Sequence, residues 1–83
     1  MLNKMQLKAA RAWLDLSQDQ LAAISGVAKR TIARIELGLA VSYDRTLRDL
    51  QAALEQKGIE FLFENGRGVG IRTQSQLEPG ASD

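Results

Sequence analysis

The chain has 83 residues, enough for one small domain with a thin hydrophobic core. Its 45% hydrophobic content is too high for a disordered chain, and its lack of cysteine and histidine excludes disulfides, thiol nucleophiles and Cys/His zinc sites. No apolar run approaches the roughly 20 residues that cross a bilayer. We therefore expect a cytoplasmic protein with no membrane contact, no metal and no cofactor.

The net charge is only +1, but the charges are unevenly distributed. Residues 1–48 contain eight Lys or Arg and four Asp or Glu, whereas residues 49–83 contain three and six. The N-terminal part is therefore the better candidate for a surface that faces phosphates.

A first helix is predicted over about residues 4–14, with a core row of Leu7, Ala10 and Leu14. A second apolar row beside it consists of Met5, Ala9, Ala12 and Trp13. Together these rows are wider than one small core needs. Part of this surface is expected to cover the C-terminal segment or to meet a second subunit.

A second, short helix is predicted over about residues 18–25. Ser17 is its expected N-cap, because Gln20 follows three residues later in the spacing of a capping box. Gly26 is expected to end the helix in a left-handed conformation.

Only three or four residues separate this helix from a third one, predicted over 28–37, and so short a turn sets two helices at a steep angle. Ile32 and Ile35 would point inward, while the opposite side would carry Lys29, Arg30, Ala33 and Arg34. Gly38 would close the helix.

A fourth helix follows the loop, with Asp44 as its expected N-cap and Ser42 as the alternative. Its core row is Leu47, Leu50 and Leu54, and it is expected to end at Gly58.

After Gly58 the apolar period changes from helical to strand-like, and Asn65-Gly66 is a strong signal for a hairpin turn. A two-residue turn would place Phe61 and Phe63 opposite Gly70 and Gly68, whereas a longer loop would shift that register. The sequence does not decide between the two. Residues 74–83 are expected to form a flexible tail.

The segment from Ser17-Gln18 through the turn at Gly26 to Glu36-Leu37-Gly38 resembles the helix-turn-helix of phage repressor and Cro proteins, the Xre-like family. The resemblance covers about residues 5–57. It implies a mainly α fold, a compact four-helix repressor-like DNA-binding domain, here followed by a C-terminal β-hairpin. It also implies that Arg11 pairs with Glu36. The lack of histidine, of cysteine, of a glycine-rich phosphate loop after a strand and of a paired acidic cluster argues against an enzyme.

The resemblance further implies that the helix over 28–37 enters the major groove, where one α-helix fits and each base pair presents its own hydrogen-bonding pattern. Lys29, Arg30 and Arg34 would face base edges or phosphates, and Ala28 could touch a thymine methyl group. Contacts to the DNA backbone are expected from Ser17 and Arg45, and also from Ser42 and Tyr43, while Gln18 would lie at the backbone or at an adjacent base.

Several of these residues also have a purely structural interpretation. The three cations of the third helix could form an ordinary solvated face, and Ser17 could act only as a cap. Arg11 and Glu36 are best interpreted as a structural ion pair, and Met5 and Trp13 as core or interface residues. The loop residues Leu39, Ala40 and Val41 stand where relatives often carry lysines, which either weakens the expected contact to the DNA backbone or marks an apolar surface for a partner.

The sequence thus predicts a helix-turn-helix DNA-binding domain over 1–58, a β-hairpin extension over 59–73 and a tail over 74–83. An isolated hairpin is marginal in water, so this one either helps dimerisation or only caps the core of its own chain. We expect a sequence-specific transcriptional regulator, a repressor that acts as a homodimer on double-stranded DNA. The alternative is an antitoxin-like module that binds a toxin and regulates itself through DNA.

Overall fold

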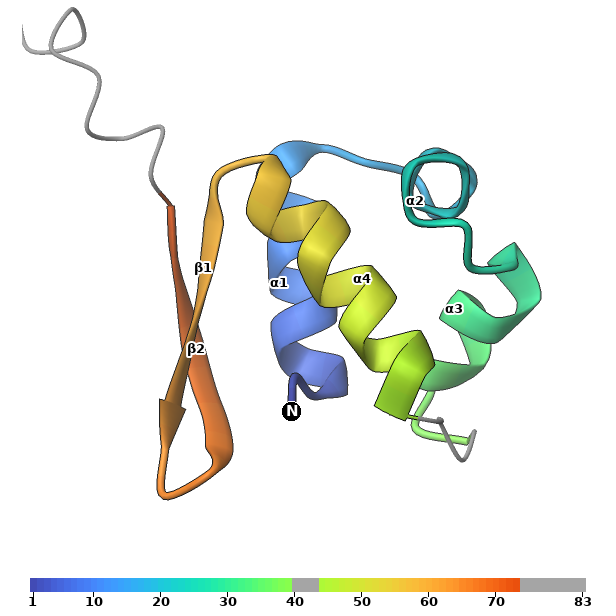
Figure 1. Cartoon of the computed structure of the whole chain (residues 1–83). Helices are drawn as coiled ribbons and strands as arrows, with labels where there is room; N and C mark the ends of the chain where they lie inside the picture. The colour runs from blue at the N-terminus through green and yellow to red at the C-terminus, as the bar shows by residue number, and fades with distance from the viewer. Residues whose placement is uncertain (40–43, 74–83) are drawn as a thin grey trace, which may run out of the picture.

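A computed structural model describes residues 1–39 and 44–73. In these residues four helices are followed by a two-stranded antiparallel hairpin (Figure 1). The elements are α1 (Lys4–Leu14), α2 (Gln18–Ser25), α3 (Lys29–Glu36), α4 (Asp44–Gln56), β1 (Ile59–Glu64) and β2 (Arg67–Thr73). The predicted mainly α fold with a C-terminal hairpin is confirmed, whereas the tail over 74–83 lies outside the described residues.

The starts of α1 and α2 are fixed by the same local device. Ser17 Oγ accepts a hydrogen bond from the Gln20 amide, and the Gln20 side chain accepts one from the Ser17 amide, which confirms the predicted capping box. Asn3 and Gln6 form an equivalent box at the start of α1. Each box satisfies backbone donors that have no partner inside the helix.

Two predicted helix boundaries are corrected by the structure. The third helix covers Lys29–Glu36 instead of 28–37, because Ala28 is its extended N-cap residue and Leu37 is its C-cap. The fourth helix begins at Asp44, so Asp44 is its first helical residue and not its N-cap. The alternative cap, Ser42, lies outside the described residues.

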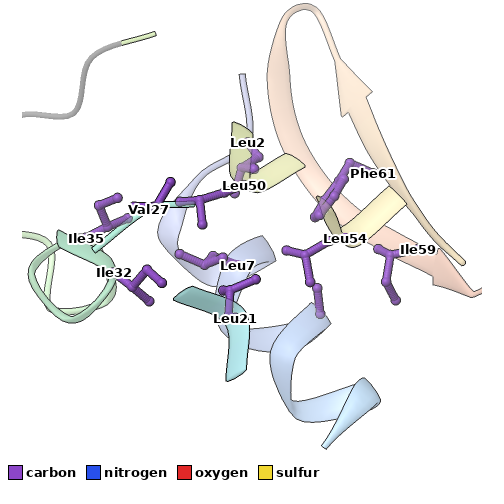
Figure 2. Packing of buried hydrophobic residues seen from close by; sticks show 11 residues of the cluster. Leu2, Leu7, Leu21, Val27, Ile32, Ile35, Leu50, Leu54, Ile59 and Phe61 are labelled. Atoms are coloured by element: carbon purple, nitrogen blue, oxygen red, sulfur yellow. The ribbon is translucent and has the colours of Figure 1, made fainter. Parts of the chain in front are cut away.

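The core is one cluster to which the helices and the hairpin contribute. Figure 2 shows Leu7 and Leu21 between Ile32 on one side and Leu54 on the other, with Ile59 and Phe61 of the hairpin next to Leu54. The row predicted on α4 is confirmed, since Leu50 and Leu54 are fully buried and Leu47 packs against the cluster. Each fully buried side chain of this size contributes about 1.5–3 kcal/mol. The hairpin therefore caps the core of its own chain.

The observed strand register of the hairpin differs from both predicted alternatives. The two-residue turn is present, with Glu64 opposite Arg67 and Phe63 opposite Gly68. Next along the ladder Leu62 faces Gly70, so Val69 has no partner and forms a β-bulge. Phe61 consequently faces Ile71, and the prediction that it faces Gly70 is wrong.

A buried glutamine joins the hairpin to α1 at this bulge. The Gln6 side chain is only 3% exposed, and its Nε2 donates to the carbonyl oxygens of Leu62 and Gly70, both at 2.9 Å. Asn3 Nδ2 donates to the carbonyl oxygen of Gly68 at 3.0 Å. We call these hydrogen bonds of Asn3 and Gln6 to the hairpin the polar clamp. They supply partners to carbonyl groups where the bulge interrupts the strand ladder.

The second apolar row of α1 remains on the surface. Met5 is 61% exposed and Trp13 is 50% exposed, so neither belongs to the core of the single chain. No helix within residues 1–39 and 44–73 has the length and apolar character to cross a membrane.

Candidate nucleic-acid interface

A short turn around Gly26 holds α2 against α3. Gly26 adopts the left-handed conformation, with φ of 77°, and its amide donates to the carbonyl oxygen of Ala22, which closes α2 as predicted. Val27 is buried, and its amide donates to Ser25 Oγ at 3.1 Å. Figure 1 shows the axis of α3 crossing that of α2 steeply at the end of the molecule away from the hairpin.

Helix α3 has one buried face and one cationic face. Ile32 and Ile35 point into the core, while Lys29, Arg30 and Arg34 are exposed. At 100° per residue, Arg30 and Arg34 lie only about 40° apart around the helix axis. Neither arginine forms an ion pair with any other described residue. We call this side, defined by Lys29, Arg30 and Arg34, the cationic face.

Lys29 differs from the two arginines because it has an acidic neighbour. Its Nζ lies 3.4 Å from Asp19 Oδ2 in the first turn of α2, and both side chains are exposed. An exposed pair of this kind contributes at most about 1 kcal/mol. It can therefore open at little cost, but in the isolated chain it directs Lys29 toward α2.

A second set of polar residues lies behind the cationic face and joins three helices. Arg11 of α1 binds Glu36 of α3 through two parallel hydrogen bonds of 2.8 Å, and its Nη1 donates to the carbonyl oxygen of Leu16. The Gln18 Nε2 donates to Glu36 Oε1 at 3.0 Å. The predicted Arg11–Glu36 pair is present, and Gln18 extends it to α2.

Glu36 is 6% exposed, so its charge depends on these partners. Burial would by itself raise the pKa of the Glu36 carboxyl, but hydrogen bonds from Arg11 and Gln18 and the charges of Arg11 and Lys8 lower it below its ordinary value. The hydrogen bond to Glu36 likewise raises the pKa of Arg11, against the effect of burial. The network is therefore ionised near neutral pH and fixes α3 relative to α1 and α2.

The remaining predicted site residues differ in whether their side chains are free to reach DNA. Ala28 is exposed at the start of α3, and Arg45 is exposed in the first turn of α4. Ser17 and Gln18 stand at the start of α2, but their side chains are engaged within the protein, the first as a cap and the second with Glu36. Ser42 and Tyr43 lie outside the described residues, and Leu39 is exposed.

The sequence interpretation missed the bond from Gln18 to Glu36 and the polar clamp. A signal for the clamp existed, because Asn3 and Gln6 have the spacing of a capping box. No local pattern reveals that a capping side chain also reaches strands more than fifty residues away.

Comparison with known families identifies this arrangement. A family model described as helix-turn-helix matches residues 7–55, more than half of the chain. The chain belongs to the Xre/Cro-like helix-turn-helix family. This family is one of DNA-binding regulatory domains and is not an enzyme family, so the protein is a DNA-binding transcription regulator. The matched residues include α2, α3 and all three residues of the Arg11–Glu36–Gln18 network. A comparison with curated proteins found no match.

Proposed function

We propose that the protein is a sequence-specific transcriptional repressor that inserts α3 into the major groove of double-stranded DNA. The observation that carries this proposal is the cationic face, where Arg30 and Arg34 are exposed on one side of a helix whose other side is buried. A helix used for major-groove recognition needs this combination of a buried face and long polar side chains near its start.

The proposed contacts follow from where each side chain lies. Arg30 and Arg34 read base edges, and guanine is their preferred partner because its O6 and N7 accept two parallel hydrogen bonds. Ala28 is placed to touch a thymine methyl group. Lys29 reaches a phosphate or base only when its pair with Asp19 opens.

Other proposed contacts go to the DNA backbone. The Gln18 amide at the start of α2 offers a hydrogen-bond donor to a phosphate, whereas the amide of Ser17 donates to Gln20 and its side chain keeps its capping role. Arg45 offers a cation from the start of α4. These contacts set the register of the protein on DNA but carry no base preference.

We further propose that the repressor is a homodimer in which residues 1–58 provide the DNA-binding unit and the hairpin over 59–73 takes part in dimerisation. Two copies would read half-sites about one helical turn, roughly 34 Å, apart. Repression follows if such a site overlaps a promoter. The antitoxin alternative uses the same DNA interface and differs by requiring a second, different protein.

Selection of bound sequences from random DNA, at a stated salt concentration, tests the proposal and defines the operator. Arg30→Ala and Arg34→Ala are each expected to weaken operator binding by roughly 1–3 kcal/mol and to relax the preference at one base position. Lys57→Ala is the control, because Lys57 is an exposed cation just beyond the end of α4, outside both α3 and the hairpin. Wild-type affinity and base preference in both α3 variants would refute the assignment of α3.

A further inference from the structure

One apolar surface of the chain has no function in the fold or in the proposed DNA interface. Met5 and Trp13 of α1 and Val69 of β2 are 61%, 50% and 56% exposed, and Ala9 lies exposed between the two α1 residues. We call these four residues the α1–β2 face. A cluster of large exposed apolar side chains is typical of an interaction site.

The α1–β2 face contains both a groove and a projecting side chain. A groove of about 330 Å³ runs between α1 and β2, lined among others by Met5, Ala9 and Val69. The polar clamp forms its floor, since Gln6 and Gly70 also line it. Trp13 lies on the same side of α1, two turns beyond Met5 and one turn beyond Ala9, because residues four apart lie on one side of a helix.

This arrangement is symmetrical about Ala9. Met5, Ala9 and Trp13 follow one another at intervals of four residues, with a small residue between two large ones. In a two-fold interface, if residue i of one copy contacts residue j of the other, then j also contacts i. A two-fold axis at Ala9 would place Trp13 of each copy over Met5 and the groove of the other.

We propose that the α1–β2 face binds a second copy of this chain, with the two α1 helices antiparallel and crossing at Ala9. This inference deepens the homodimer of the proposed function and rests on it. The small side chain of Ala9 permits close approach of the helices, while Trp13 supplies the large aromatic anchor that commonly dominates an interface.

The size of the face limits how tightly a second copy can bind. Helix α1 is about 16 Å long at 1.5 Å per residue, and β2 is about 23 Å long at 3.3 Å per residue. A helix about 10 Å wide with one strand spacing of about 5 Å beside it gives a face of roughly 250–350 Å² per partner. This area is well below the roughly 800 Å² per partner of a standard interface, so we expect a weak, concentration-dependent dimer.

The proposed dimer also leaves the cationic face accessible. Ala9 is two residues from Arg11, which corresponds to about 200° around the helix, and Arg11 is the residue that binds α3 through Glu36. The face around Ala9 therefore points away from α3. A second copy bound there does not cover Arg30 or Arg34.

Disulfide cross-linking tests this geometry in the full chain without DNA. Because the native sequence contains no cysteine, Ala9→Cys introduces a single thiol, and the matched control Ala23→Cys places one on the exposed side of α2. Two helices that cross at small residues approach to about 8 Å between their axes, which brings the Cα atoms within reach of a disulfide. We expect mild oxidation to convert most of the Ala9→Cys protein to a covalent dimer and to leave most of the Ala23→Cys protein monomeric.

Sedimentation over a concentration series provides the second measurement. Trp13→Gln is expected to weaken self-association at least tenfold, whereas Ile24→Gln, which changes an exposed apolar residue of α2, should leave it unchanged. Trp13 is the only tryptophan, so its emission should shift to shorter wavelength as the wild-type chain associates.

Each negative result contradicts a different statement. A dimer that neither cross-links through Ala9→Cys nor responds to Trp13→Gln would overturn this interface while leaving the proposed homodimer intact. A wild-type chain that stays monomeric at high concentration and on its operator would overturn both this interface and the proposed homodimer. A chain that forms a stable complex only with a different protein, through Trp13, would also overturn both. Loss of base preference in the α3 variants is measured separately and does not depend on this interface.

Discussion

Gly68 offers the sharpest test of how the hairpin is attached to the helices. A Cβ at this position would lie only 1.9 Å from Gln6 Oε1 and 2.8 Å from Asn3 Nδ2. The φ angle of Gly68 is outside the left-handed region, so its backbone conformation would accept alanine. Glycine is therefore needed here because the polar clamp passes close to the strand, and not because of backbone strain.

The cost of Gly68→Ala follows from what Gln6 must give up. If the added methyl group displaces the side-chain amide of Gln6, that amide loses its three hydrogen bonds, to the Leu62 and Gly70 carbonyl groups and to the Asn3 backbone N–H. At about 1 kcal/mol each they sum to about 3 kcal/mol. Alanine returns up to about 1 kcal/mol by restricting the unfolded chain. We expect a net loss of about 2 kcal/mol, or about 8–16 °C in Tm for a domain of this size.

A double-mutant cycle measured by urea unfolding isolates the effect. Gln6→Ala alone should cost about 2–3 kcal/mol, because it leaves the two strand carbonyl groups without their donor. In that background the Gln6 amide is absent and only Asn3 Nδ2 still lies close to the added Cβ, so Gly68→Ala should no longer cost about 2 kcal/mol and should range from neutral to a gain of about 1 kcal/mol. An equal cost of Gly68→Ala in both backgrounds would refute the reasoning, as would a neutral effect in the wild-type background.

Two further predictions concern the helix-turn-helix. Glu36 has a lowered pKa in the folded chain, so its ionised form stabilises the fold above its ordinary pKa, and that contribution is lost as pH falls through the folded value. Glu36→Gln should therefore cost about 2–4 kcal/mol at pH 7 and clearly less at pH 3 by urea unfolding, whereas an equal cost at both pH values would contradict the role of its charge. Gly26→Ala should cost about 1 kcal/mol through its positive φ alone, since a Cβ there meets no atom within 4 Å; a loss above about 3 kcal/mol in thermal melts would indicate a packing role instead.

Much of the helical part could be predicted from sequence because its signals are local. The bounds of α1 and α2 agree with the apolar periodicity and with the Ser17 and Gly26 signals. The predicted first residues of α3 and α4 are each wrong by one position. Whether Ala28 and Asp44 are N-cap residues or the first residues of a helix depends on their backbone conformation, which the side-chain pattern does not show.

The hairpin was less predictable because its register depends on tertiary contacts. Asn65-Gly66 correctly predicted the two-residue turn, but nothing near Val69 marks it as a bulge. The bulge is stabilised by Gln6, and that contact exists only after the chain has folded. For the candidate site, the helical pattern correctly predicted which side of α3 carries Arg30 and Arg34. It could not show that Lys29 pairs with Asp19 or that Gln18 binds Glu36.

The polar clamp has a consequence for how the protein is made. The partners of Gln6 lie 56 and 64 residues later in the chain, in β1 and β2, which leave the ribosome after all four helices. Until those strands emerge, the first helix carries an amide whose final acceptors do not yet exist, and Leu54 lacks the covering side chains of Ile59 and Phe61. A nascent chain that ends at residue 58 is therefore incomplete as a folding unit, and competence to bind an operator should arise only once synthesis has passed the hairpin.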